Sequence, residues 1–167
     1  PERVMTSPPS DGQREMLRHI LATVAYRACK ALQKAPDSFA DFRYADKSRT
    51  PAKLLSHLAD LFDWALSMAE GKPRWHDSQP LPWEQGVDRF FASLQKFDEY
   101  LASAKPVHAP MEKLFQGPIA DAFTHIGQMA MLRRMAGAPA KSENFYVAEI
   151  TVGRLGPDQA LPVFEFD

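Results

Sequence analysis

Two side chains that can bind a metal lie four residues apart in the stretch IADAFTHIGQMAMLRRMAG, which runs from Ile119 to Gly137. On a helix, residues at this spacing stack on one face, so Asp121 and His125 could reach one cation. Helix-borne zinc motifs place two histidines at the same spacing. A projection at 100° per residue puts both side chains, with Leu132, on one border of the apolar arc. We therefore expect the pair to point towards a seam between helices.

A histidine in an earlier segment could complete the site. His57 lies three residues after Leu54 and four before Leu61, on an apolar stripe. A buried imidazole needs a partner, because an unpaired buried polar group costs about 1–3 kcal/mol. A divalent cation held by His57, Asp121 and His125 would supply one, and three protein ligands are typical of a catalytic site. The residues also leave open an alternative without a metal. In that case His57 is a hydrogen-bonded core histidine, and Asp121 is either a favourable charge near a helix N-terminus or a partner that orients His125.

Other polar side chains are weaker candidates for the same pocket. Asp60 is either a substitute ligand or an exposed residue, and exposure is the favoured interpretation. His76, beside Trp75, could line a pocket mouth, although a surface position is favoured. Glu143 and Asn144 of the C-terminal tail are further candidates for the pocket.

The arginines after the metal-binding pair have two interpretations. Arg133 and Arg134 could bind an anionic substrate, but the favoured role is to complement the negative end of their own helix and pair with acidic neighbours. Met129, Met131 and Met135 are interpreted mainly as packing residues, with a place at an interface as the alternative. Cys29 is interpreted as a small buried hydrophobe, because nothing in its local sequence would lower its pKa.

Apolar residues spaced by threes and fours predict four amphipathic helices. Thr50 and Pro51 provide an N-cap and a first helical residue for the second helix. Four such helices must bury their stripes against one another, so we predict an all-α four-helix bundle. Its connections are longer than tight turns, so the helices need not alternate up and down. The apolar stripes run over residues 17–32, 54–68 and 87–101, and the last helix is predicted from about Pro118 to Ala136.

The length suits a single domain covering residues 1–167. Residues 1–10 are rich in Pro and Ser and are predicted to form a loose N-terminal arm. Residues 138–167 are predicted to form an irregular tail packed on the bundle, with FYVAEITVG as a short extended piece.

Composition excludes several classes of partner. With 20 Lys and Arg against 21 Asp and Glu, the formal net charge is −1 and no basic stripe favours nucleic acid. No apolar run is long enough to span a bilayer, and no signal-peptide pattern is seen at the start. The single cysteine cannot form an internal disulfide. We therefore expect no membrane partner and a cytoplasmic location.

Two segments combine the candidate ligands with longer motifs: LLSHLADLFDWAL, residues 54–66, and DAFTHIGQMAMLRRMAGAPAKSENF, residues 121–145. Both segments resemble the DinB-like (DinB/YfiT) superfamily. The resemblance covers the four helices and implies a bundle with nickel or zinc bound by three histidines, one in the second helix and two four residues apart in the last. His57 and His125 match two of these positions. Asp121 stands in place of the third histidine, and a carboxylate is a harder ligand than imidazole, so metal affinity and identity are affected.

The resemblance also implies an activity. It favours a divalent-metal-dependent hydrolase or an S-transferase that uses a low-molecular-weight thiol such as bacillithiol, mycothiol or glutathione, acting on a small molecule as a homodimer. One alternative is a non-catalytic module that binds a small ligand and has a degenerate metal site. Another is a stress-related interaction protein that acts through a dimer face. The enzyme hypothesis requires the ring nitrogens of His57 and His125 to lie close enough to share a cation.

Overall fold

The first helix, α1 (Asp11–Leu32), begins at a capping box. The Ser10 side chain accepts from the Gln13 amide at 3.2 Å, and the Gln13 side chain accepts from the Ser10 amide at 2.9 Å. The computed structural model describes residues 10–166, so the predicted N-terminal arm lies outside the described residues except for Ser10.

The second helix starts as its sequence predicts. In α2 (Pro51–Ala69), the Thr50 hydroxyl accepts from the Lys53 amide at 3.2 Å, and Pro51 occupies the first turn. The helix ends before Gly71, whose φ of 77° suits a residue without Cβ. The third helix, α3 (Trp83–Ala102), follows after the connection 70–82.

The last helix begins earlier than predicted. A short α-helix, α4 (Met111–Leu114), continues through a π-helical turn (Phe115–Ile119) into α5 (Ala120–Met135). The predicted start at Pro118 is therefore wrong. Proline lacks the N–H that an α-helical turn requires, and the wider π turn carries Pro118 without ending the helix.

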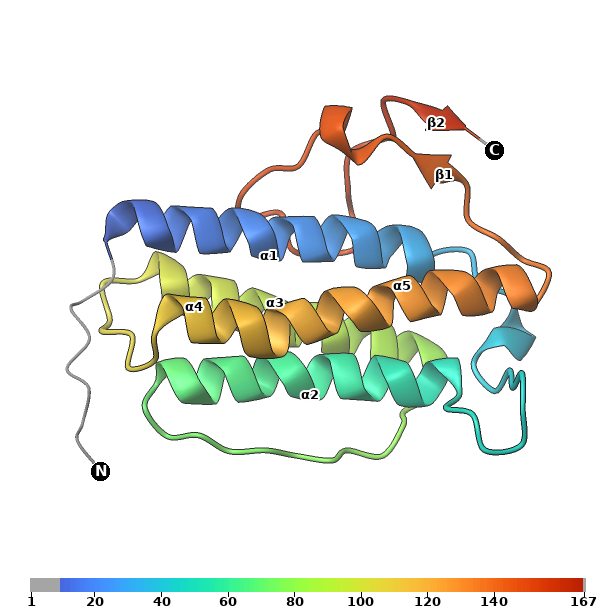
Figure 1. Cartoon of the computed structure of the whole chain (residues 1–167), viewed down its shortest axis with the longest axis horizontal. Coiled ribbons are helices and arrows are strands. Elements are labelled where there is room, and N and C mark those ends of the chain that lie inside the picture. The colour runs from blue at the N-terminus through green and yellow to red at the C-terminus, as the bar shows by residue number, and fades with distance from the viewer. Residues whose placement is uncertain (1–9, 167) are drawn as a thin grey trace.

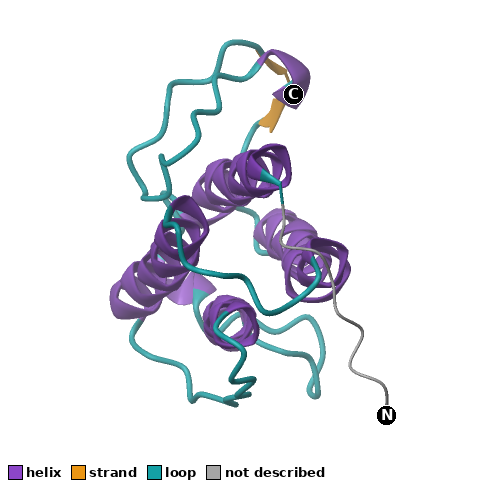
Figure 2. Cartoon of the chain, turned by 90° about the vertical axis from the view of Figure 1, so that its left-hand side faces the viewer, coloured by secondary structure: helices purple, strands orange, loops and turns teal. Residues whose placement is uncertain are grey.

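The helices form a bundle with an unusual order of directions. In Figure 1, α1 and α5 run one way while α2 and α3 run the other. The connection 70–82 returns along the length of α2 before α3 starts, which is why two consecutive helices are parallel. Packing joins α2 to both α3 and α5, and α1 to the same two helices. The end-on view in Figure 2 shows the helices around a common axis. The all-α bundle with long connections is confirmed.

The core fills the space between the helices with large apolar side chains. Each predicted stripe faces inward, and burial of such side chains stabilises the fold by about 1.5–3 kcal/mol apiece. The largest fully buried side chains include Leu21, Leu55, Leu58, Phe62, Phe90, Leu94, Phe97 and Met129.

The tail lies against α1 and is mostly irregular. Strand β1 (Ser142–Glu143) pairs antiparallel with β2 (Glu165–Phe166). Phe145–Val147 forms a 3₁₀ turn, so the extended piece predicted there is wrong at these residues. Glu143 anchors the tail, accepting from the Tyr26 hydroxyl at 2.6 Å and from the Lys30 ammonium at 2.7 Å. In residues 10–166, no helix has both the length and the apolar character needed to cross a bilayer.

Candidate metal centre

The three predicted ligands meet at the seam between α2 and α5. One carboxylate oxygen of Asp121, Oδ2, lies 3.2 Å from Nε2 of His57 and 3.3 Å from Nε2 of His125. The two imidazole rings stand at 89° to each other with centroids 4.7 Å apart. One ligand atom from each residue lies within 4.8 Å of the others, so the group could hold a metal ion.

Local structure explains how the three side chains reach one point. His57 lies in the second turn of α2, where its neighbours Leu54, Leu58 and Leu61 are buried and fix the rotation of the helix. Asp121 and His125 follow directly after the π turn, which adds a residue to the helical repeat and so sets the register of α5. The sequence marks this turn only by a proline within a helical pattern.

The spacing of the donor atoms fits a first-row divalent cation. Ligands about 2.0–2.1 Å from a tetrahedral zinc ion lie about 3.4 Å apart, close to the two Asp121–histidine separations. Two imidazoles with one carboxylate form a donor set that zinc and nickel accept. The side chains are 22% (His57), 12% (His125) and 46% (Asp121) exposed. Water and small ligands can therefore reach the open side of the site.

Gln128 orients one of the imidazoles. Its Oε1 lies 2.8 Å from Nδ1 of His125. Because the amide oxygen can only accept, this contact favours the tautomer whose proton is on Nδ1. In the neutral ring, Nε2 then presents a lone pair towards Asp121, which is itself an acceptor. Two acceptors facing each other at 3.3 Å need a cation between them or an added proton. The hydrogen-bond pattern therefore suits a metal-binding imidazole held by a neighbouring carbonyl oxygen.

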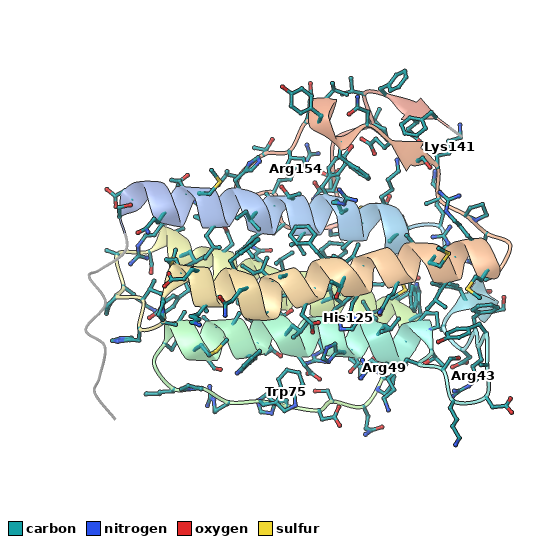
Figure 3. All side chains as sticks on the ribbon, in the orientation of Figure 1. Arg43, Arg49, Trp75, His125, Lys141 and Arg154 are labelled. Carbon is teal, nitrogen blue, oxygen red and sulfur yellow. The ribbon has the colours of Figure 1, made fainter. Side chains whose placement is uncertain are left out.

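Aromatic rings cover one side of His57. Trp75 packs edge-on against the imidazole, with centroids 5.6 Å apart, and Trp64 packs against Trp75 in the same manner. Trp75 belongs to the connection 70–82 (Figure 3), so the return path of this segment brings an aromatic wall to the candidate ligand His57. His76, the next residue, is exposed and makes no part of this wall.

Asp60 is neither a ligand nor an exposed residue. The predicted exposure is wrong, because the residue is only 2% exposed. Its carboxylate accepts from the amide and the hydroxyl of Ser78, at 2.9 and 2.7 Å, and from Arg89 at 2.5 Å. These partners lie 18 and 29 residues further along the chain, so no local pattern revealed them. Asp60 therefore ties the connection 70–82 to α2 and α3.

A pocket of about 380 Å³ opens beside His125. Sequence reasoning missed Tyr44 and Arg49, because both come from the connection between α1 and α2 and carry no motif. The remaining lining comes mainly from one face of α5. The lining residues are Tyr44, Arg49, Leu54, His125, Gln128, Met131, Leu132 and Met135.

The other candidates lie away from the centre. Figure 3 shows Lys141 of the tail and Trp75 on opposite sides of the bundle. Glu143 is engaged with α1 on the tail side, where it lines a separate pocket of about 790 Å³. Asn144 accepts from the Tyr146 amide within its own turn. Neither tail residue joins the three ligands.

Arg133 serves the end of a different helix from the one predicted. It is 4% exposed and donates to the carbonyls of Ala31, Gln33 and Ala138 at 3.0, 2.8 and 2.6 Å. The first two carbonyls belong to the C-terminal end of α1 and would otherwise lack helical donors. Burial lowers the pKa of this guanidinium. Arg134 is exposed and donates to Ser142 at 3.1 Å.

Cys29 is buried as predicted. Burial, followed by the nearby charge of Asp158, raises the pKa of its thiol to about 11. The thiol donates to the Pro157 carbonyl at 3.1 Å, which holds the tail against α1. This cysteine is therefore a packing residue with little thiolate at neutral pH.

Comparisons of the chain with protein-family models, with curated proteins and with solved structures find no match. The assignment of chemistry therefore depends on the geometry of the centre.

Proposed function

We propose that this chain is a divalent-metal-dependent enzyme of the DinB-like type, a hydrolase or a low-molecular-weight-thiol S-transferase that acts on a small molecule in the cytoplasm. His57, Asp121 and His125 would hold nickel or zinc. The observation that carries the proposal is that a single Asp121 oxygen lies within 3.3 Å of an imidazole nitrogen from each of two helices.

The surroundings support chemistry as well as binding. A bound divalent cation lowers the pKa of a coordinated water or thiol and so provides a nucleophile near neutral pH. In the chain itself, Gln128 fixes the orientation of the His125 ring. Trp75 shields His57 from water on one side, while the pocket beside His125 leaves room for a substrate on the other. A closed structural site would have neither the exposed carboxylate nor the adjoining pocket.

Calorimetric titration of tag-free protein with nickel and with zinc tests the proposal. We expect one ion per chain, with binding lost in His57→Ala and in His125→Ala. His19→Ala is the matched control, because His19 is an exposed histidine on α1. Binding that survives both substitutions, or that is equally weakened by His19→Ala, would contradict the proposed centre.

Activity assays of the loaded protein separate the two reactions. Ester hydrolysis without added thiol indicates a hydrolase, whereas consumption of bacillithiol, mycothiol or glutathione together with an electrophile indicates an S-transferase. Either activity should disappear in His57→Ala. Tight metal binding with neither activity across these substrates would favour a ligand-binding module instead.

A further inference from the structure

The pocket beside His125 has one arginine, Arg49, and an apolar wall. Met131, Leu132 and Met135 lie along one face of α5, and Leu54 faces them from α2. Arg49 and Tyr44 contribute polar ends from the connection that precedes α2. Within residues 10–166, the lining of this pocket contains no Asp or Glu side chain. An anion entering the pocket would therefore meet a positive group without a competing carboxylate in the wall.

The backbone on both sides of Arg49 is held in place. The Ser48 hydroxyl donates to the Ala45 carbonyl at 2.8 Å, and the Ser48 carbonyl accepts from Arg43 at 2.8 Å. On the other side, Thr50 caps α2. The guanidinium of Arg49 forms no ion pair with any residue of the described range. A charged side chain on an anchored backbone, with its donors free, is arranged to bind an anion.

The pocket and the metal centre share a residue. His125 lines the pocket while its Nε2 faces Asp121. Figure 3 shows Arg49 and His125 on the same side of the bundle. A ligand held by Arg49 can therefore extend along the methionine face and present its far end to the metal-binding residues.

We propose that Arg49 selects small-molecule substrates that carry a carboxylate or phosphate group on an apolar body. The anionic group pairs with the guanidinium, whose planar fork matches either oxyanion in a bidentate manner. The apolar body lies against Met131, Leu132 and Met135, where flexible methionine side chains adapt to its shape. The inference rests on the proposed function, because it places the reacting end of the substrate at the metal centre.

Binding of phenylacetate by metal-free protein, measured by calorimetry, tests the anion site. The metal is left out because a carboxylate also binds metal ions directly. Phenylacetamide, which has the same shape without the charge, should bind about three- to tenfold more weakly. Arg49→Gln should reduce phenylacetate affinity to that of the amide. Lys53→Gln is the matched control, since it removes an exposed cation from the first turn of α2 without altering the pocket lining.

Two outcomes would overturn the inference: equal binding of acid and amide by the unaltered protein, and unchanged phenylacetate binding in Arg49→Gln. Zinc titration of Arg49→Gln keeps this result separate from the proposed function, because the substitution leaves the three ligands intact. If Arg49→Gln binds zinc normally and its affinity for phenylacetate is unchanged, only the proposed anion site is contradicted. If the unaltered protein does not bind zinc but binds phenylacetate in a manner that depends on Arg49, the proposed function is contradicted and the anion site stands.

Discussion

The imidazoles of His57 and His125 stand nearly perpendicular at 89°, with ring centroids 4.7 Å apart, although they belong to two helices far apart in the chain. Their Nε2 atoms both face Oδ2 of Asp121. This arrangement meets the condition that the enzyme hypothesis set, because the two rings are close enough to share a cation. It also makes Asp121 the residue on which the properties of the centre depend most directly.

Replacing Asp121 should raise or lower the affinity for metal, depending on the residue that takes its place. Asp121→His supplies a third imidazole, a ligand better suited to nickel and zinc than a carboxylate, and we expect about tenfold tighter binding. Asp121→Asn keeps the size but removes the charge, and we expect weaker binding by a similar factor. Calorimetry with both metals measures the two changes. Equal affinities in all three proteins would show that the residue at position 121 does not contact the ion.

Gln128 should affect metal binding without touching the ion. Gln128→Leu removes the acceptor for Nδ1–H of His125 and frees the ring to turn, so affinity for zinc should fall about 10–100-fold. The melting temperature without metal should change little, because the side chain is exposed. Gln85→Leu, at an exposed glutamine of α3, is the control. If Gln85→Leu lowers zinc affinity by the same factor, the effect does not depend on the contact between Gln128 and His125.

Arg89 should stabilise the connection that carries Trp75. Arg89→Met leaves the buried Asp60 carboxylate without its cation and should lower the free energy of unfolding by about 3 kcal/mol. Asp63→Asn removes the other, half-exposed partner of Arg89 and should cost less than about 1 kcal/mol. Urea denaturation measures both. Trypsin should also cleave after Arg74 faster in Arg89→Met than in Asp63→Asn, and equal rates would exclude Asp60 as the anchor of this segment.

Cys29 should make the protein less stable at high pH. Burial raises the pKa of its thiol from 9.0 to about 11 in the folded chain, so the unfolded chain releases this proton first. The contribution of the buried, protonated thiol to the free energy of unfolding is therefore fully present below about pH 9. It declines as pH rises towards 11, by about 2–3 kcal/mol in all. Urea denaturation at several pH values should show a shallower decline in Cys29→Ala. Parallel curves for the two proteins would assign the alkaline loss to other groups, such as Tyr26, whose pKa burial also raises.

The sequence determined the parts of this protein that depend on local spacing. Apolar residues at threes and fours predicted the helices and the faces that they bury. Thr50 and Pro51 predicted where α2 begins. The same periodicity placed His57 on a buried stripe and Asp121 beside His125, because residues four apart on a helix share a face whatever surrounds them.

Tertiary structure alone decided which distant residues became partners. The π turn around Pro118 set the register of α5, and the return path of residues 70–82 brought Trp75 to His57. The fold also gave buried Asp60 its donors, Arg89 and Ser78, and it placed the Arg133 guanidinium at the C-terminal end of α1. A charged side chain can be buried only where the fold supplies its partners, and those partners lie too far along the chain for any local pattern to indicate them.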